Sequence, residues 1–150
     1  MSDTIIVATF DNTNAAYDAA SAMKKLMDQK IVDFKPKAGV MVKKDDLGNL
    51  SLLENKDRPL FGTAVGTVTG ALIGLIGGAP GAALGASLGA ISGVGSDAIL
   101  AALDSDFVDS VTSEIRPGMT AIIVEADEKS TKAVDDIVAR GGGHVRRQAA

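Results

Sequence analysis

TIIVATF, residues 4–10, is the stretch that decides the fold, because a similar apolar run, AIIV, returns at residues 121–124. Both runs are rich in β-branched residues, which is typical of buried strands. The first run is followed by Asp11 and Asn12, either of which can cap a helix, and the second is followed by Asp127. A helical pattern comes after each of them. Two strand–helix–strand units predict an α+β fold, specifically a ferredoxin-like sandwich. The near-continuous apolar runs favour buried strands of the parallel type.

The elements around these two runs follow from turn and capping signals. The first helix is expected to end near residue 29, the next main strand to begin near residue 38, and a return strand to cover residues 50–54. An acidic amphipathic helix is expected before Arg116-Pro117-Gly118, with an apolar residue at every fourth position: Ile99, Leu103, Phe107, Val111 and Ile115. A helix over residues 129–140 should end at three glycines, and residues 144–148 should form the last strand. Residues 1–59 and 97–150 would therefore build one α+β domain that folds without the segment between them.

Residues 60–96, the glycine-rich segment, carry no charge and repeat glycine at every fourth position in two runs, 62–78 and 81–93, with a break between them. This spacing places the glycines on one stripe of each arm of an inserted helical hairpin. A glycine inside an exposed helix costs about 1 kcal/mol relative to alanine, so a compensating contact is expected, namely close approach between helices. The residues predicted to pack helices and drive self-association are Gly62, Gly66, Gly70, Gly74, Gly78, Gly81, Gly85, Gly89 and Gly93.

The bulky side chains of the hairpin are expected to contact either lipid or a protein core. They are Leu60, Phe61, Val65, Val68, Leu72, Ile73, Leu75, Ile76, Leu84, Leu88 and Ile91. Residues 60–78 would span about 28 Å as a helix, close to the roughly 30 Å of a bilayer core. The first arm carries most of the bulky residues, whereas the second arm is too weakly apolar to insert alone. Length and hydrophobicity leave both environments open.

The order of these segments resembles a known family. The resemblance is carried by IIVATFD, VMVKKDDLGNLSLLE, the glycine repeat, SDFVDSVTSEIRPGMTAIIV and the closing GGHV, which together cover nearly the whole chain. The family consists of uncharacterised bacterial proteins described as predicted membrane proteins, some of them linked by name to stress response. The resemblance implies an α+β domain with an inserted glycine-zipper hairpin and a membrane link. It implies no catalytic residue.

Composition argues against several function classes. The net charge of −4 and the pI of about 4.9 give no electrostatic support for nucleic-acid binding. The chain has no cysteine, hence no disulfide framework, zinc–thiolate cluster or thiol nucleophile. The N-terminus lacks the pattern of a signal peptide, so we expect the chain to stay in the cytoplasm.

The remaining polar motifs have ordinary structural explanations. Asp45 and Asp46 are adjacent, whereas the ligands of a calcium loop occupy alternate positions, so a hairpin turn explains these two acids. His144 is the only histidine, so one chain cannot build a catalytic triad or a two-histidine metal site. The glycines at 141–143 follow a helix, whereas a phosphate loop precedes one. The acids of the amphipathic helix form its polar side, and the basic residues, such as Arg146 and Arg147, are too few for a lipid patch.

The sequence therefore predicts a non-enzymatic, membrane-associated protein that forms homo-oligomers through the glycine-zipper hairpin. It would lie at the cytoplasmic side of the bacterial inner membrane, with no cofactor, no metal and no nucleic-acid partner. One alternative is a fully soluble cytoplasmic cage or filament with the hairpins buried inside. Another is a ferredoxin-like module that binds a small ligand, although five aromatic residues provide little pocket signal.

Overall fold

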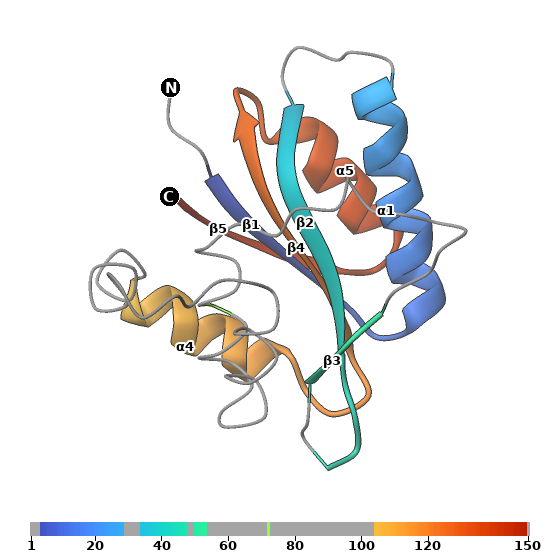
Figure 1. The fold of residues 1–150 in the computed structure, drawn as a ribbon, viewed down its shortest axis with the longest axis vertical. Helices are drawn as coiled ribbons and strands as arrows, with labels where there is room; N and C mark the ends of the chain where they lie inside the picture. Colours follow the sequence, from blue (N-terminus) through green and yellow to red (C-terminus); the bar gives the residue numbers. More distant parts are fainter. Residues whose placement is uncertain (1–3, 29–33, 48–49, 54–71, 73–103, 150) are drawn as a thin grey trace.

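The computed structural model describes residues 4–28, 34–47, 50–53, 72 and 104–149. These residues form an α+β structure, as the sequence predicts. In chain order the elements are β1 (Thr4–Phe10), α1 (Thr13–Asp28), β2 (Phe34–Lys44), β3 (Leu50–Leu52), α4 (Ser105–Glu114), β4 (Thr120–Glu128), α5 (Lys132–Arg140) and β5 (His144–Ala149). The strands form one five-stranded sheet in the order β3-β2-β4-β1-β5 (Figure 1).

Every strand pairing in this sheet is antiparallel, so the expectation of parallel-type strands is wrong. The apolar runs of β1 and β4 have another cause, because side chains are buried on both faces of these two central strands. Two-sided burial removes the alternation of polar and apolar residues that an antiparallel strand shows when one face meets water. The apolar runs of β1 and β4 therefore indicate that both faces of the sheet are covered, and they give no information on strand direction.

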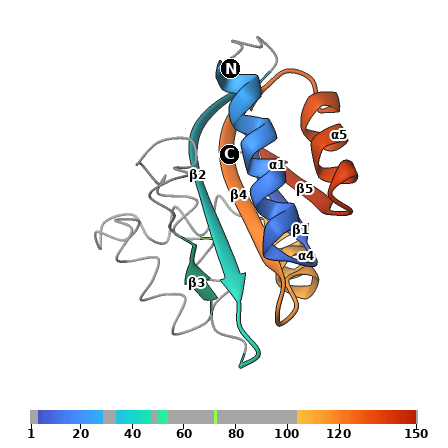
Figure 2. The same ribbon diagram turned by 90° about the vertical axis from the view of Figure 1, so that its right-hand side faces the viewer.

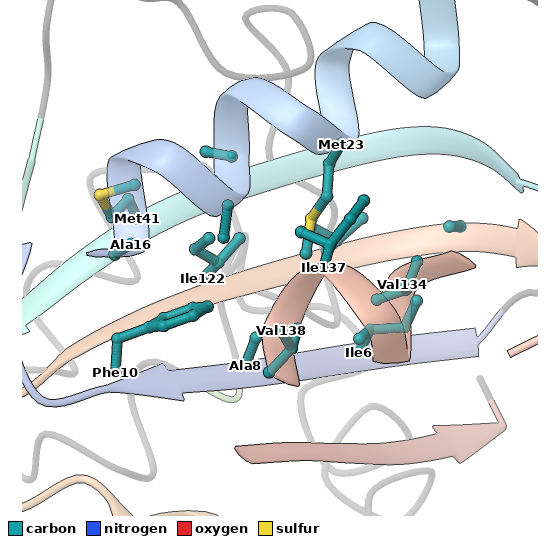
Figure 3. Close-up of a cluster of buried hydrophobic side chains, with 14 of the residues drawn as sticks. Ile6, Ala8, Phe10, Ala16, Met23, Met41, Ile122, Val134, Ile137 and Val138 are labelled. Carbon is teal, nitrogen blue, oxygen red and sulfur yellow. The ribbon is translucent and has the colours of Figure 1, made fainter. Parts of the chain in front are cut away.

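Helices α1 and α5 cover one face of the sheet, which we call the first face, and α4 lies on the opposite, second face (Figures 1 and 2). The core of the first face is built from alternate residues of the central strands, such as Ile6, Ala8 and Ile122 (Figure 3). Met23 of α1 and Ile137 of α5 pack onto them. Small residues on α1, including Ala16, bring this helix close to the sheet.

Several element boundaries differ from the sequence prediction. β2 begins at Phe34 instead of residue 38, because its pairing with β4 continues past Pro36 with a register irregularity between Pro36 and Ala38. α5 begins at Lys132 instead of residue 129, since β4 extends to Glu128. Asp127 consequently lies buried within β4 and caps no helix.

Other local predictions are confirmed. The backbone N–H of Ala15 donates to Asn12 Oδ1 at 2.8 Å, so Asn12 caps the start of α1. The N–H of Leu47 donates to Asp45 Oδ1 at 2.9 Å inside the expected turn. α5 ends at Arg140 with Gly141 as its C-cap, and Gly142 has a φ of 71°, a conformation that favours glycine. The return strand β3 ends at Leu52 and is shorter than predicted. Residue 54, its predicted end, and residues 99 and 103 of the predicted helical stripe lie outside the described residues.

Candidate functional site: the second face of the sheet

The second face of the sheet is an apolar surface built by strand alternation. Ile5 and Val7 of β1 point to it, while Ile6 and Ala8 point to the first face. The pairing registers place Val40 of β2 opposite Ile123 of β4, and Val7 of β1 opposite the same residue. The complete buried cluster of this face comprises Ile5, Val7, Val40, Val42, Leu50, Leu72, Phe107, Val111, Ile115, Ala121 and Ile123.

Helix α4 covers part of this face with three residues of the stripe that the sequence predicted. Phe107 and Val111 of α4 and its C-cap residue Ile115 are buried in the cluster, because a spacing of four residues places them on one side of the helix. Asp104 caps the helix: its side chain accepts from the N–H of Asp106 at 2.9 Å. The acids of α4 thus form its polar side, as expected.

Polar contacts at both ends hold α4 to the edge strand β5. The backbone N–H of Asp104 donates to Gln148 Oε1 at 2.8 Å. At the other end, Arg146 Nε donates to Glu114 Oε1 at 2.7 Å. Arg146 and Gln148 are two residues apart on β5, so they share the second face of the sheet. Together these contacts fix α4 at the β5 side of the second face.

Leu72 supplies the link between this face and the glycine-rich segment. Its conformation is helical, its exposed fraction is 0%, and it belongs to the buried cluster with Val42 and Leu50. It is the one described residue of those predicted to contact lipid or core. All of the predicted packing glycines, and the other apolar residues predicted for the hairpin, lie outside the described residues. The hairpin itself is therefore not described.

A second polar group lies on the first face at β5. Arg147 Nε donates to Glu128 Oε1 at 2.6 Å, and its Nη2 donates to Glu128 Oε2 at 3.1 Å and lies 2.7 Å from Asp135 Oδ1. Burial of Arg147 lowers its pKa, but the hydrogen bonds and charges of the two acids outweigh burial and raise that pKa above its ordinary value. The guanidinium thus stays charged and ties β5 to the end of β4 and the start of α5.

The two arginines of β5 therefore serve different faces. Adjacent residues of a strand point to opposite sides, so Arg146 meets α4 and Arg147 meets β4 and α5. From the sequence alone they are only two of a few basic residues, too few for a lipid patch. Their alternation along the predicted last strand was the available signal, but the acidic partners come from elements distant in sequence.

A groove of about 460 Å³ lies on the outer side of the first face, between α1 and α5. Small and polar residues of α1, including Ala15, Ala22 and Asp18, form one wall, and Ile137 and Arg140 of α5 form the other. Within the described residues no group of three or more histidine, cysteine or acidic side chains could hold a metal ion. His144 is exposed on β5.

The family model for proteins of unknown function, DUF1269, matches residues 63–149. The chain belongs to the DUF1269 family. The matched region joins most of the glycine-rich segment to α4, β4, α5 and β5, so one family unit contains both Leu72 and the helix that shares its cluster. Searches among curated proteins and among solved structures find no match. None of the helices in the described part of the chain is both long and apolar enough to cross a bilayer.

Proposed function

We propose that this DUF1269 protein is a non-enzymatic assembly protein that forms homo-oligomers through its glycine-rich segment. The observation that carries the proposal is glycine at every fourth position in each of two runs, residues 62–78 and 81–93, within the charge-free residues 60–96. Such a stripe lets helix backbones approach closely, and the contact between them offsets the low helix propensity of glycine. The burial of Leu72 against the sheet supports a second element of the proposal, in which the α+β domain positions the segment.

The domain that carries the segment is proposed to be ferredoxin-like. The strand order supports this description, because α1 connects β1 to β2 while β4 lies between these two strands. In the same way, α5 connects β4 to β5 with β1 between them. Two interleaved β–α–β units of this kind define the ferredoxin-like pattern. β3 adds a short edge strand to β2.

The environment of the assembly is proposed to be the cytoplasmic side of the bacterial inner membrane. The bulky residues of the first arm supply about −0.5 kcal/mol each toward insertion, roughly −4 kcal/mol for eight of them. Charge would contribute little, because the net charge is −4 and both arginines of β5 are engaged by acids. A fully soluble assembly with buried hairpins is the second candidate. It is favoured by the burial of Leu72 within protein.

The test of assembly is the molar mass of the protein in solution. The double variant Gly70→Leu/Gly85→Leu adds bulk on both glycine stripes and should disperse the oligomer, as measured by light scattering. The double variant Ala71→Leu/Ala86→Leu adds similar bulk one position away in each arm and should retain the mass. An unchanged mass for the glycine variant would refute assembly through the stripes.

A further inference from the structure

We infer that the part of the second face built by β2 and β3 is an autoinhibitory seat, which holds Leu72 and withholds it from lipid and from other copies of the chain. This inference rests on the proposed function, in which the glycine-rich segment assembles. The seat consists of Val40 and Val42 of β2 and Leu50 of β3, which share a buried cluster with Leu72. Every one of these side chains is apolar, so the seat recognises an apolar side chain and gives no polar contact to a substitute.

The position of α4 explains why the seat needs a separate occupant. The contacts with Gln148 and Arg146 fix α4 to β5, which is one edge of the sheet. With strands about 4.8 Å apart, β2 lies roughly 14 Å from β5. A helix with its side chains is about 10 Å wide, so α4 alone does not reach over β2 and β3. At that end of the face, Leu72 from the glycine-rich segment joins the cluster.

Seating and assembly compete for the same side chain. Leu72 lies between Gly70 and Gly74 in the first arm, where helix packing and lipid insertion would both use it. A leucine that is fully buried on the sheet cannot contact lipid at the same time. The protein therefore has a seated state and a released state, and whatever binds the released state preferentially shifts the population toward it. Weakening the seat has the same effect.

The seated state can be measured with a single thiol, because the chain has no cysteine. In the Leu72→Cys variant, the thiol should react with a maleimide at least about tenfold more slowly than the thiol of Leu47→Cys. Leu47 is the matched reference because its exposed fraction is 87%. Equal rates for the two variants would show that position 72 is unprotected and would overturn the inference.

Release can be tested by weakening the seat and by weakening the opposite face in parallel. Val42→Ala and Leu50→Ala trim the seat, whereas Met41→Ala trims the first face from the neighbouring position on β2. On the Leu72→Cys background, the seat variants should raise thiol reactivity several-fold more than Met41→Ala does. In proteins that keep Leu72, they should also increase either flotation with neutral phosphatidylcholine vesicles or the oligomer mass.

Seat variants that expose the thiol but change neither flotation nor mass would overturn the inference, because the contact would then be only structural. The inference would also be overturned if Met41→Ala promoted flotation or assembly as strongly as the seat variants do. Leu50 lies on the short edge strand β3, so Leu50→Ala serves as the second variant if Val42→Ala does not fold. Failure of the glycine variants to disperse the oligomer would instead refute the proposed function, whatever the thiol shows.

Discussion

Leu72→Ala should destabilise the α+β domain, although residue 72 is 20 positions from the nearest end of a described strand, Leu52. The leucine is 0% exposed and packs in the cluster of the second face. Truncation to alanine removes three carbon atoms at about 0.8 kcal/mol each, and the remaining cavity adds to that loss. We therefore expect the free energy of unfolding to fall by about 3 kcal/mol.

Urea unfolding followed by far-UV circular dichroism measures this change. With a slope near 2 kcal/mol per molar urea, the midpoint should fall by about 1.5 M. The control is Leu47→Ala, which removes the same atoms from a side chain that is 87% exposed and should change stability by less than about 0.5 kcal/mol. Equal effects of the two substitutions would refute the assignment of Leu72 to the folding core.

The burial of Leu72 alters the expectation that residues 1–59 and 97–150 fold without the segment between them. A chain in which a short Gly/Ser linker joins Pro59 to Asp97 should still unfold cooperatively, because the five strands and α4 remain. It should lose the contribution of Leu72 and be less stable than the full chain by about 3 kcal/mol or more. Thermal unfolding of both chains tests this, and equal stabilities would contradict it.

Three further predictions concern the polar contacts, the last turn and the membrane. In urea unfolding, Glu128→Gln should lower the free energy of unfolding by about 1–3 kcal/mol, because it weakens the bidentate pair of Glu128 and Arg147, whose side chains are 2% and 20% exposed. Glu114→Gln should lower it by less than about 1 kcal/mol, because its partner Arg146 is 46% exposed. Gly143→Ala should cost about 3 kcal/mol, because the added Cβ would lie 2.6 Å from the backbone oxygen of Thr9. Gly142→Ala meets open space and carries only the strain of its positive φ, about 1–2 kcal/mol. Urea unfolding that shows a smaller loss for Gly143→Ala than for Gly142→Ala would contradict this. Flotation of the protein with neutral vesicles should change little with salt concentration or with the double substitution Lys43→Ser/Lys44→Ser. If neither the protein nor its Val42→Ala variant ever floats, the soluble assembly becomes the better account.

The sequence by itself determined the local elements of this protein, because their signals lie within a few residues of one another. The apolar runs of β1 and β4, the stripe Phe107, Val111, Ile115 on α4 and the glycines after α5 all report local periodicity or backbone conformation. Asn12 could be named as a candidate cap because a cap bonds to its own helix. The α+β class follows from the order of these elements.

Only the tertiary structure decided the direction of the strands, the two-sided burial of the sheet and the partners of Arg146 and Arg147. Each depends on which distant segments pair, and periodicity within one segment carries no information about its partner. The start of β2 at Phe34 was set in the same way, by pairing with Glu128 across the sheet. The place of Leu72 is the strongest example. Its sequence neighbours leave lipid and a protein core equally open, and only the tertiary structure places it in the buried cluster of the second face.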